Sequence, residues 1–130
     1  MKKLVGIGVA GAMAIAVLSA MPAFASRAVL AAPVVTTGHC SGPSTWMLTL
    51  KYDAGRVESD VEVQTPRAGQ AWNLKMFDNG VKFGAGTKTT LADGSWSATR
   101  YAANRAGPDH ITVKATNQVT GETCTATGTK

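Results

Sequence analysis

Few side chains in this sequence could act as catalytic bases or nucleophiles. A Ser or Cys nucleophile needs an imidazole base beside it and a third group that orients the base. The only histidines are His39, which precedes a cysteine, and His110, which follows a Pro-Asp pair. Neither lies near a Gly-x-Ser-x-Gly sequence, the turn that exposes a nucleophilic serine in many hydrolases. The sequence therefore predicts no catalytic residue and no enzyme, with a small hydrolase as an alternative.

Three carboxylates alternate along one segment, at Glu58, Asp60 and Glu62. On a strand they would share one face at spacings of about 7 Å, which is compatible with an acid pair or a calcium site. Charges in such a row also keep an exposed strand from pairing with other chains. We expect this second role, and we predict no metal site and no cofactor, since a glycine-rich phosphate loop is also absent from the sequence.

The chain has two cysteines, Cys40 and Cys124. In an oxidising compartment two cysteines are expected to form a disulfide bond. Free thiols or a metal pair are the alternatives, but a structural zinc site needs four ligands and the sequence supplies only two histidines. The cysteines therefore predict a single bond that closes a long loop.

The first 25 residues have the order of features found in secretory signals. Lys2 and Lys3 precede an uncharged stretch rich in Ala, Gly and Val, and Ala23-Phe24-Ala25 fits a cleavage site. An uncleaved membrane anchor is the alternative, because the apolar stretch is near the lower length limit for a span. We predict a signal peptide at 1–25, a flexible leader at 26–39 and one secreted domain at 40–130. Losing both lysines lowers the net charge from +5 to +3, well below that of a typical nucleic-acid binder.

Apolar and polar residues alternate with a period of two between the cysteines, and turn residues interrupt the alternation at short intervals. No stretch after residue 25 has a helical period. This pattern predicts short antiparallel strands with one buried face each. The segments are 45–53, 57–64, 72–77, a strand from 81, 95–101, 110–117 and a last strand around 124.

The Asn-Gly pair at 79–80 is the strongest local signal, because both residues tolerate the positive φ angles of a two-residue hairpin turn. The turn also fixes the register of its two strands. In that register Met76 faces Phe83 on the buried side, and Gly84 and Gly86 lie on the outer side.

About seven strands joined by tight turns predict an all-β fold, an antiparallel sandwich of the immunoglobulin or fibronectin type III kind. We expect the first, second and fifth strands in one sheet and the other four in the second sheet. A closed barrel is the alternative. Trp46, Trp72 and Trp96 share the phase of the buried residues, so we expect them in the core rather than on a sugar-binding platform.

A set of short motifs spread over residues 40–124 resembles small secreted immunoglobulin-like proteins of actinobacteria, an uncharacterised family. The resemblance implies export, the sandwich and the cysteine pair, and it transfers no catalytic or binding residue. The motifs are Cys40, Ser44-Thr45-Trp46-x-Leu48, Gly55-Arg56-Val57-Glu58, Arg67-Ala68-Gly69-Gln70-x-Trp72, Asp78-Asn79-Gly80-Val81 and Ala115-Thr116-Asn117-x-x-Thr120-Gly121-Glu122-x-Cys124.

The outer face of the predicted four-stranded sheet is the best candidate for a binding site. It is expected to be flat, hydroxyl-rich and positive, with Glu58, Asp60 and Glu62 on the opposite side of the domain. We predict a secreted, non-catalytic binding or structural module that contacts an acidic envelope component or another protein, without nucleic acid or stable membrane insertion. The residues of this face are Lys75, Phe77, Lys82, His110 and Lys114.

The sequence is compatible with two alternatives. The face could be an ordinary solvated surface whose threonines serve strand formation. The domain could also be a protease inhibitor that presents the loop 104–109 with Arg105, although no disulfide is available near that loop.

Overall fold

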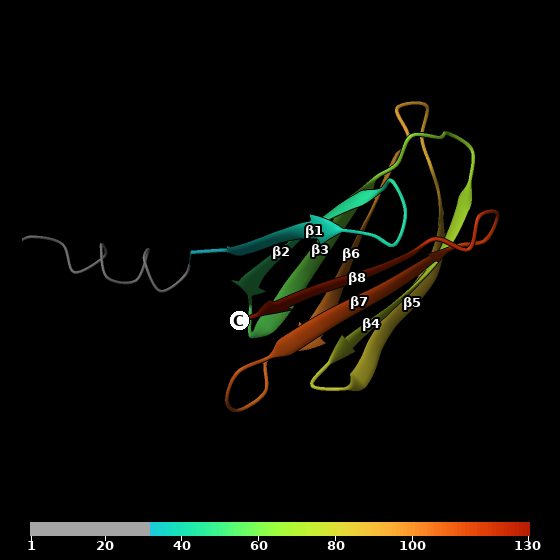
Figure 1. The fold of residues 1–130 in the computed structure, drawn as a ribbon. Coiled ribbons are helices and arrows are strands. Elements are labelled where there is room, and N and C mark those ends of the chain that lie inside the picture. Colours follow the sequence, from blue (N-terminus) through green and yellow to red (C-terminus); the bar gives the residue numbers. More distant parts are fainter. Residues whose placement is uncertain (1–31) are drawn as a thin grey trace, which may run out of the picture.

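Antiparallel strands account for most of the part of the chain that this computed structural model describes, residues 32–130 (Figure 1). The predicted signal peptide at 1–25 lies outside the described residues. Within 32–130 no helix is long and apolar enough to span a membrane. The strands are β1 (Val34–His39), β2 (Thr45–Asp53), β3 (Arg56–Gln64), β4 (Ala71–Asp78), β5 (Val81–Thr89), β6 (Ser95–Ala103), β7 (His110–Asn117) and β8 (Thr123–Thr129).

The strands form two four-stranded sheets that pack face to face. The first sheet has the order β1-β2-β3-β6, and the second has the order β5-β4-β7-β8. At one side of the sandwich β1 lies over β8, and at the other side β5 lies over β6. The predicted division of the strands from 45 onward between two sheets is therefore confirmed, and the closed barrel is wrong.

One strand falls where the sequence predicted a flexible leader at 26–39. β1 pairs with β2 along its whole length, from Val34 opposite Leu50 to His39 opposite Thr45. The leader prediction is wrong for residues 34–39. Only Val34 is both apolar and directed inward in this strand, and Thr36 and Gly38 follow it on the same side. The hydrophobic alternation is too weak to reveal a strand, whereas pairing with β2 satisfies its backbone groups.

The core lies between the sheets and includes two of the three tryptophans. The rings of Trp72 and Trp96 are fully buried, with centroids 6.0 Å apart. Trp46 is half-buried and packs on Gly38 of β1, where a Cβ atom would lie only 2.5 Å from the indole ring. The prediction that the tryptophans belong to the core is confirmed for Trp72 and Trp96, and Trp46 packs at its margin.

The β4–β5 hairpin has the predicted two-residue turn. Asn79 and Gly80 have φ angles of 48° and 83°, as this kind of turn requires. Phe77 lies opposite Lys82, also as predicted. The sequence therefore identified both the position and the type of this turn.

The register beyond the turn differs from the prediction, because β5 contains a β-bulge. Met76 pairs with Gly84, which leaves Phe83 as the extra residue. Gly84 and Gly86 consequently lie on the inner side, and the prediction that they face outward is wrong. The side chain of Arg100 from β6 lies across them, 2.9 Å from where a Cβ of Gly84 would be. The two glycines make room for an arginine at this margin of the core.

The predicted disulfide bond joins Cys40 to Cys124, which are 84 positions apart in the sequence. Cys40 follows β1 and Cys124 lies in β8, so the bond links the neighbouring outermost strands of the two sheets. Nearby, the Glu122 carboxylate accepts hydrogen bonds from the backbone N–H groups of Gly42 and Ser44 and from the Ser44 hydroxyl. We call this end of the sandwich the disulfide end.

Candidate functional site

The five side chains of the predicted binding face lie together on the outer surface of the second sheet. Lys75 and Phe77 are on β4, Lys82 is on β5, and His110 and Lys114 are on β7. Strand pairing places Phe77 beside Lys82 on one side and near Lys114 on the other. We call these five residues the basic face.

Two lysines of the basic face occupy directly opposed positions on neighbouring strands. Lys75 of β4 pairs with Lys114 of β7. Like charges in this position destabilise a sheet. Lys114 Nζ lies 5.6 Å from the centre of the Phe77 ring, which gives it a weak cation–π contact. Among the described residues, neither of these lysines nor Lys82 forms an ion pair.

Hydroxyl groups surround the lysines of the basic face. The threonines that share this side of β7 and β8 are exposed or half-buried, and they form two adjacent rows. On β5, the Thr87 hydroxyl donates to Asn73 Oδ1 at 3.0 Å. The face is therefore flat, polar and positive, with Phe77 as its one aromatic residue. The threonines are Thr112, Thr116, Thr123, Thr125, Thr127 and Thr129.

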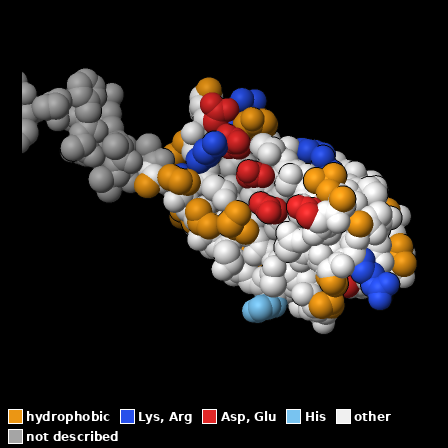
Figure 2. Space-filling model, turned by 90° about the horizontal axis from the view of Figure 1, so that it is seen from above, with side chains coloured by type: hydrophobic (Ala, Val, Ile, Leu, Met, Phe, Trp, Pro, Cys, Tyr) orange, Lys and Arg blue, Asp and Glu red, His pale blue; other side chains and the backbone are white. Residues whose placement is uncertain are grey.

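The outer face of the first sheet carries the opposite charge. Asp60 and Glu62 are exposed there, and Glu58 is half-buried and 3.5 Å from Lys51 Nζ. Figure 2 shows several acidic side chains near the middle of one face, with hydrophobic, lysine and arginine side chains at several places around them. Beside Glu62, a hollow of about 470 Å³ opens over the side chain of Met47. The outer face of the first sheet therefore carries three carboxylates together with Lys51, whereas the charged side chains of the basic face are all lysines.

The two histidines lie far apart on the sandwich. His39 is exposed beside the disulfide, whereas His110 lies at the opposite end of the sandwich, where its Nδ1 is 2.9 Å from Thr129 Oγ1. Within residues 32–130, no three side chains of the His, Cys, Asp and Glu types converge as a metal cluster would. The two histidines therefore cannot act on one substrate atom together.

Sequence reasoning missed a pair of buried carboxylates at the end opposite the disulfide, which we call the carboxylate end. Asp78 is the last residue of β4 and Asp109 immediately precedes β7, and they are 1% and 0% exposed. Asp109 exchanges two backbone hydrogen bonds with Lys130. The Arg105 Nε atom lies 4.0 Å from Asp78 Oδ2, so the loop 104–109 is held against the sandwich. The sequence does contain a signal for Asp78, because this residue continues the alternation of buried residues that includes Leu74 and Met76.

The pKa of Asp78 is raised to about 6, from an ordinary value of 3.8, and burial is the largest cause. A hydrogen bond to the neighbouring Asp109 carboxyl and the charge of that carboxyl contribute to the rise, whereas the positive charges of Arg105 and His110 oppose it. An ionised carboxylate is costly in such surroundings, since it has lost its water and gained no hydrogen-bond donor.

In buffer free of divalent cations, the stability of the domain should depend on pH through this pair. A folded-state pKa above the unfolded value means that the folded chain holds the proton more tightly. The resulting stabilisation is fully present below about pH 4 and is lost as the pH rises through about 6. We expect the free energy of unfolding to fall by roughly 1–3 kcal/mol across this range. In Asp78→Asn this decline should disappear, whereas Asp60→Asn on the opposite face should keep it. Urea titrations from pH 4 to 7.5 measure the difference, and a decline retained in Asp78→Asn would contradict the prediction.

Fold and surface define the class of protein as an all-β, disulfide-linked sandwich of two antiparallel sheets with oppositely charged faces. Comparison with protein-family models, with curated proteins and with solved structures finds no match to this chain.

Proposed function

We propose that this chain is a secreted, non-catalytic binding module whose basic face contacts an anionic polymer of the cell envelope. The observation that carries this proposal is the direct opposition of Lys75 and Lys114. The pair weakens the sheet on its own, and no carboxylate on the same face compensates for it. An extended anion lying across β4 and β7 would turn this repulsion into attraction.

The shape of the face favours an extended partner over a small molecule. The hollow beside Glu62 is on the acidic face, and a second one of about 340 Å³ lies among loops at the disulfide end. The basic face has only flat rows of lysine and threonine. Hydroxyl groups donate hydrogen bonds to phosphate, sulfate or carboxylate oxygens, and lysine supplies a point charge that tolerates several geometries.

We also propose that the sandwich belongs to the immunoglobulin and fibronectin type III class. Strands β2, β3 and β6 form three neighbouring strands of one sheet, and β5, β4, β7 and β8 form the other. This division matches the one expected for that class from the sequence. β1 is an addition at the edge of the first sheet. The disulfide supports the proposed location outside the cell, because such bonds persist in oxidising surroundings.

Charge reversal on one face at a time tests the proposed function. The triple variant Lys75→Glu, Lys82→Glu, Lys114→Glu should lose at least about tenfold of its affinity for isolated envelope material, since roughly 1.4 kcal/mol of lost attraction has that effect. Binding by the unaltered chain should weaken as salt rises from 50 to 500 mM, because exposed charges are screened.

The matched control places the same number of reversals on the opposite face, as Glu58→Lys, Asp60→Lys, Glu62→Lys. This variant should bind at least as well as the unaltered chain. Circular dichroism and thermal melts establish that both variants fold. Equal binding by the two triple variants would show that the basic face is not the site.

A further inference from the structure

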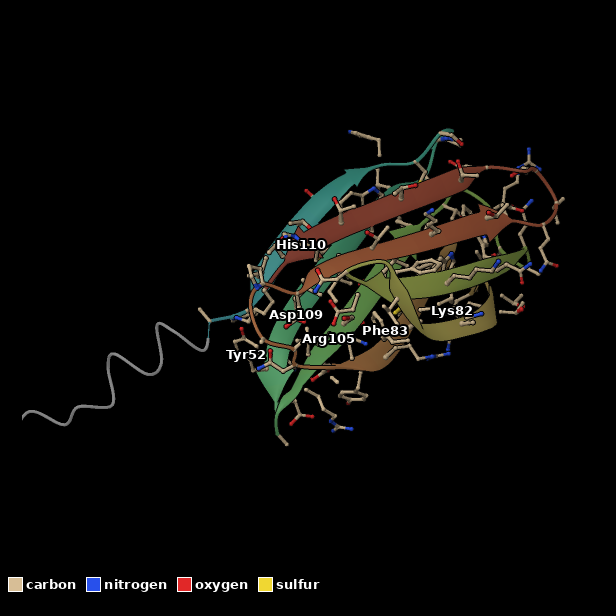
Figure 3. The ribbon with its side chains drawn as sticks, turned by 90° about the horizontal axis from the view of Figure 1, so that it is seen from below. Tyr52, Lys82, Phe83, Arg105, Asp109 and His110 are labelled. Carbon is tan, nitrogen blue, oxygen red and sulfur yellow. A yellow bond between two sulfur atoms is a disulfide. The ribbon has the colours of Figure 1, made fainter. Side chains whose placement is uncertain are left out.

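Three loops surround a hollow of about 340 Å³ at the disulfide end, outside the basic face. They are 40–44 between β1 and β2, 65–70 between β3 and β4, and 118–122 between β7 and β8. We call this feature the loop hollow. In Figure 3, Asp109 and His110 mark the opposite end of the sandwich. The volume is near the lower end of the range found for small-ligand sites, so the loop hollow suits a ligand of few atoms.

The walls of the loop hollow are held in place by bonds to neighbouring segments. The Ser41 N–H donates to the Thr123 carbonyl at 2.8 Å, and the Thr123 N–H donates to the Ser41 hydroxyl at 2.9 Å. In the second loop, the hydroxyl of buried Thr90 donates to the Arg67 carbonyl at 2.8 Å. The disulfide bond of Cys40 lies at the same end. A hollow whose walls are already ordered costs less entropy to fill, which favours binding.

Two residues of opposite charge, Arg67 and Glu122, line the loop hollow without pairing with each other. Arg67 is exposed, and only its backbone atoms form hydrogen bonds within residues 32–130. Neither its guanidinium nor the Glu122 carboxylate forms an ion pair in this part of the chain, so the two groups lie beyond ion-pair distance of each other. Glu122 would repel a simple anion and Arg67 a simple cation. A molecule that carries both charges is attracted by each residue.

Hydrogen-bonding groups in the loop hollow have capacity for both ends of such a molecule. Each of two hydroxyls accepts a backbone N–H, Ser41 Oγ at 2.9 Å and Thr120 Oγ1 at 3.2 Å. Neither hydroxyl donates a hydrogen bond among the described residues, so both protons are available to ligand oxygens. Glu122 Oε2 accepts two backbone N–H groups, whereas Oε1 accepts only the Ser44 hydroxyl, at 2.7 Å. A carboxylate oxygen accepts two bonds, so Oε1 has room for an ammonium group.

We propose that the loop hollow binds a small zwitterion, an α-amino acid or a dipeptide. Arg67 binds the carboxylate, because a planar guanidinium matches two carboxylate oxygens at once. The two free hydroxyl protons donate to the remaining lone pairs of the same carboxylate. Glu122 accepts the ammonium group of the ligand. Pro43 and Pro66, which also line the hollow, supply apolar rings against which a short aliphatic side chain packs.

The experiment follows the amide chemical shifts of the ¹⁵N-labelled protein during titration with alanine and with alanylalanine at pH 7. We expect saturable shifts in the three loops of the hollow and none on β5 or at the carboxylate end. The dissociation constant should be about 1–10 mM, because a ligand of so few atoms makes few contacts. The tighter of the two ligands identifies the length that fits between Arg67 and Glu122. Loop signals that respond to neither ligand would overturn the proposal.

Derivatives of the tighter ligand test each charge without altering the protein. The C-terminal amide keeps the ammonium group and lacks the carboxylate, whereas the N-acetyl derivative keeps the carboxylate and lacks the ammonium group. Each should bind at least about tenfold more weakly than the zwitterion, since each loses one charged contact. Equal binding by all three ligands would contradict recognition of a zwitterion.

One variant and its matched control connect the binding to Arg67. Arg67→Gln should fold, because the backbone bonds of this residue remain, and should bind the zwitterion at least about tenfold more weakly. It should bind the amide derivative as the unaltered chain does, because that ligand has no carboxylate to lose. Arg56→Gln removes an exposed arginine at the start of β3, at the other end of the sandwich, and should leave all affinities unchanged. Unchanged zwitterion binding in Arg67→Gln, or weakened binding in Arg56→Gln, would overturn the proposal.

Discussion

Replacing both Cys40 and Cys124 by alanine is expected to lower the free energy of unfolding by about 2–5 kcal/mol. The bond closes a loop of 84 positions, for which the chain-entropy relation gives about 4.5 kcal/mol. A domain of this size has a stability of only about 5–15 kcal/mol, so the loss is a large part of the total. Urea denaturation of the unaltered and the double-alanine chains measures the difference.

Removal of the disulfide should destabilise β1 more than any other strand. This strand is at the edge of the first sheet, and its inner residues Thr36 and Gly38 contribute little apolar contact. Outside strand pairing, it is held by the disulfide, by the packing of Val34 and of Gly38 against Trp46, and by a hydrogen bond from the Thr36 hydroxyl to the Thr127 carbonyl at 2.7 Å. Amide hydrogen exchange in the variant should accelerate in β1 more than in β3. Uniform acceleration in both strands would contradict a local role for the bond at β1.

The second large effect is expected from Gly94→Ala, which should destabilise the fold by roughly 3 kcal/mol or more. Gly94 is buried, has a φ of 83°, and leaves only 2.1 Å between an added Cβ and the carbonyl oxygen of Thr65. Its own carbonyl accepts hydrogen bonds from the Thr65 N–H and hydroxyl. Movement of the turn before β6 away from Thr65 would relieve the clash, but it would also break those hydrogen bonds.

Gly107→Ala is the matched control for this substitution. Gly107 has nearly the same φ, 80°, but no atom lies within 4 Å of an added Cβ. It should cost only the 1–2 kcal/mol typical of a left-handed non-glycine residue. Thermal melts of the two variants measure the two losses of stability. Their difference is the cost of the steric clash at Gly94, since the cost of the left-handed backbone is common to both. Equal losses at the two positions would mean that the contact with Thr65 is relieved by movement of the turn.

Hydrophobic alternation was sufficient to predict most of the sandwich. The alternation of Val57, Val61 and Val63 with charged residues identified β3, and the Asn79-Gly80 turn identified the hairpin. These signals are local, since each depends on residues that are neighbours in the sequence. The basic face followed from the same period, because Lys75 and Lys114 have the opposite phase to the buried side chains.

The failures have a different physical origin. β1 is a strand because β2 offers it a pairing edge, and its own residues carry little periodic signal. The bulge at Phe83 moves Gly84 and Gly86 inward, where the side chain of Arg100 from another strand occupies the space beside them. The sequence around Phe83 contains no information about that contact. These features depend on contacts between distant parts of the chain.

The buried carboxylates illustrate the same limit at a site. The alternation along β4 places the side chain of Asp78 on the buried side. Its partner Asp109 belongs to a loop in which hydrophobic residues do not alternate. Their proximity depends on the pairing of β4 with β7 and on the backbone bonds of Asp109 to Lys130. A sequence pattern within either segment could not have predicted the pair.

The separation of charge between the two faces gives the domain an electric dipole perpendicular to its sheets. Two packed sheets are only about 10 Å apart, so the dipole crosses the short dimension of the molecule. Near a negatively charged surface it produces a torque that turns Lys75, Lys82 and Lys114 toward that surface before any contact forms. In that orientation Asp60 and Glu62 face away from the surface, toward solvent.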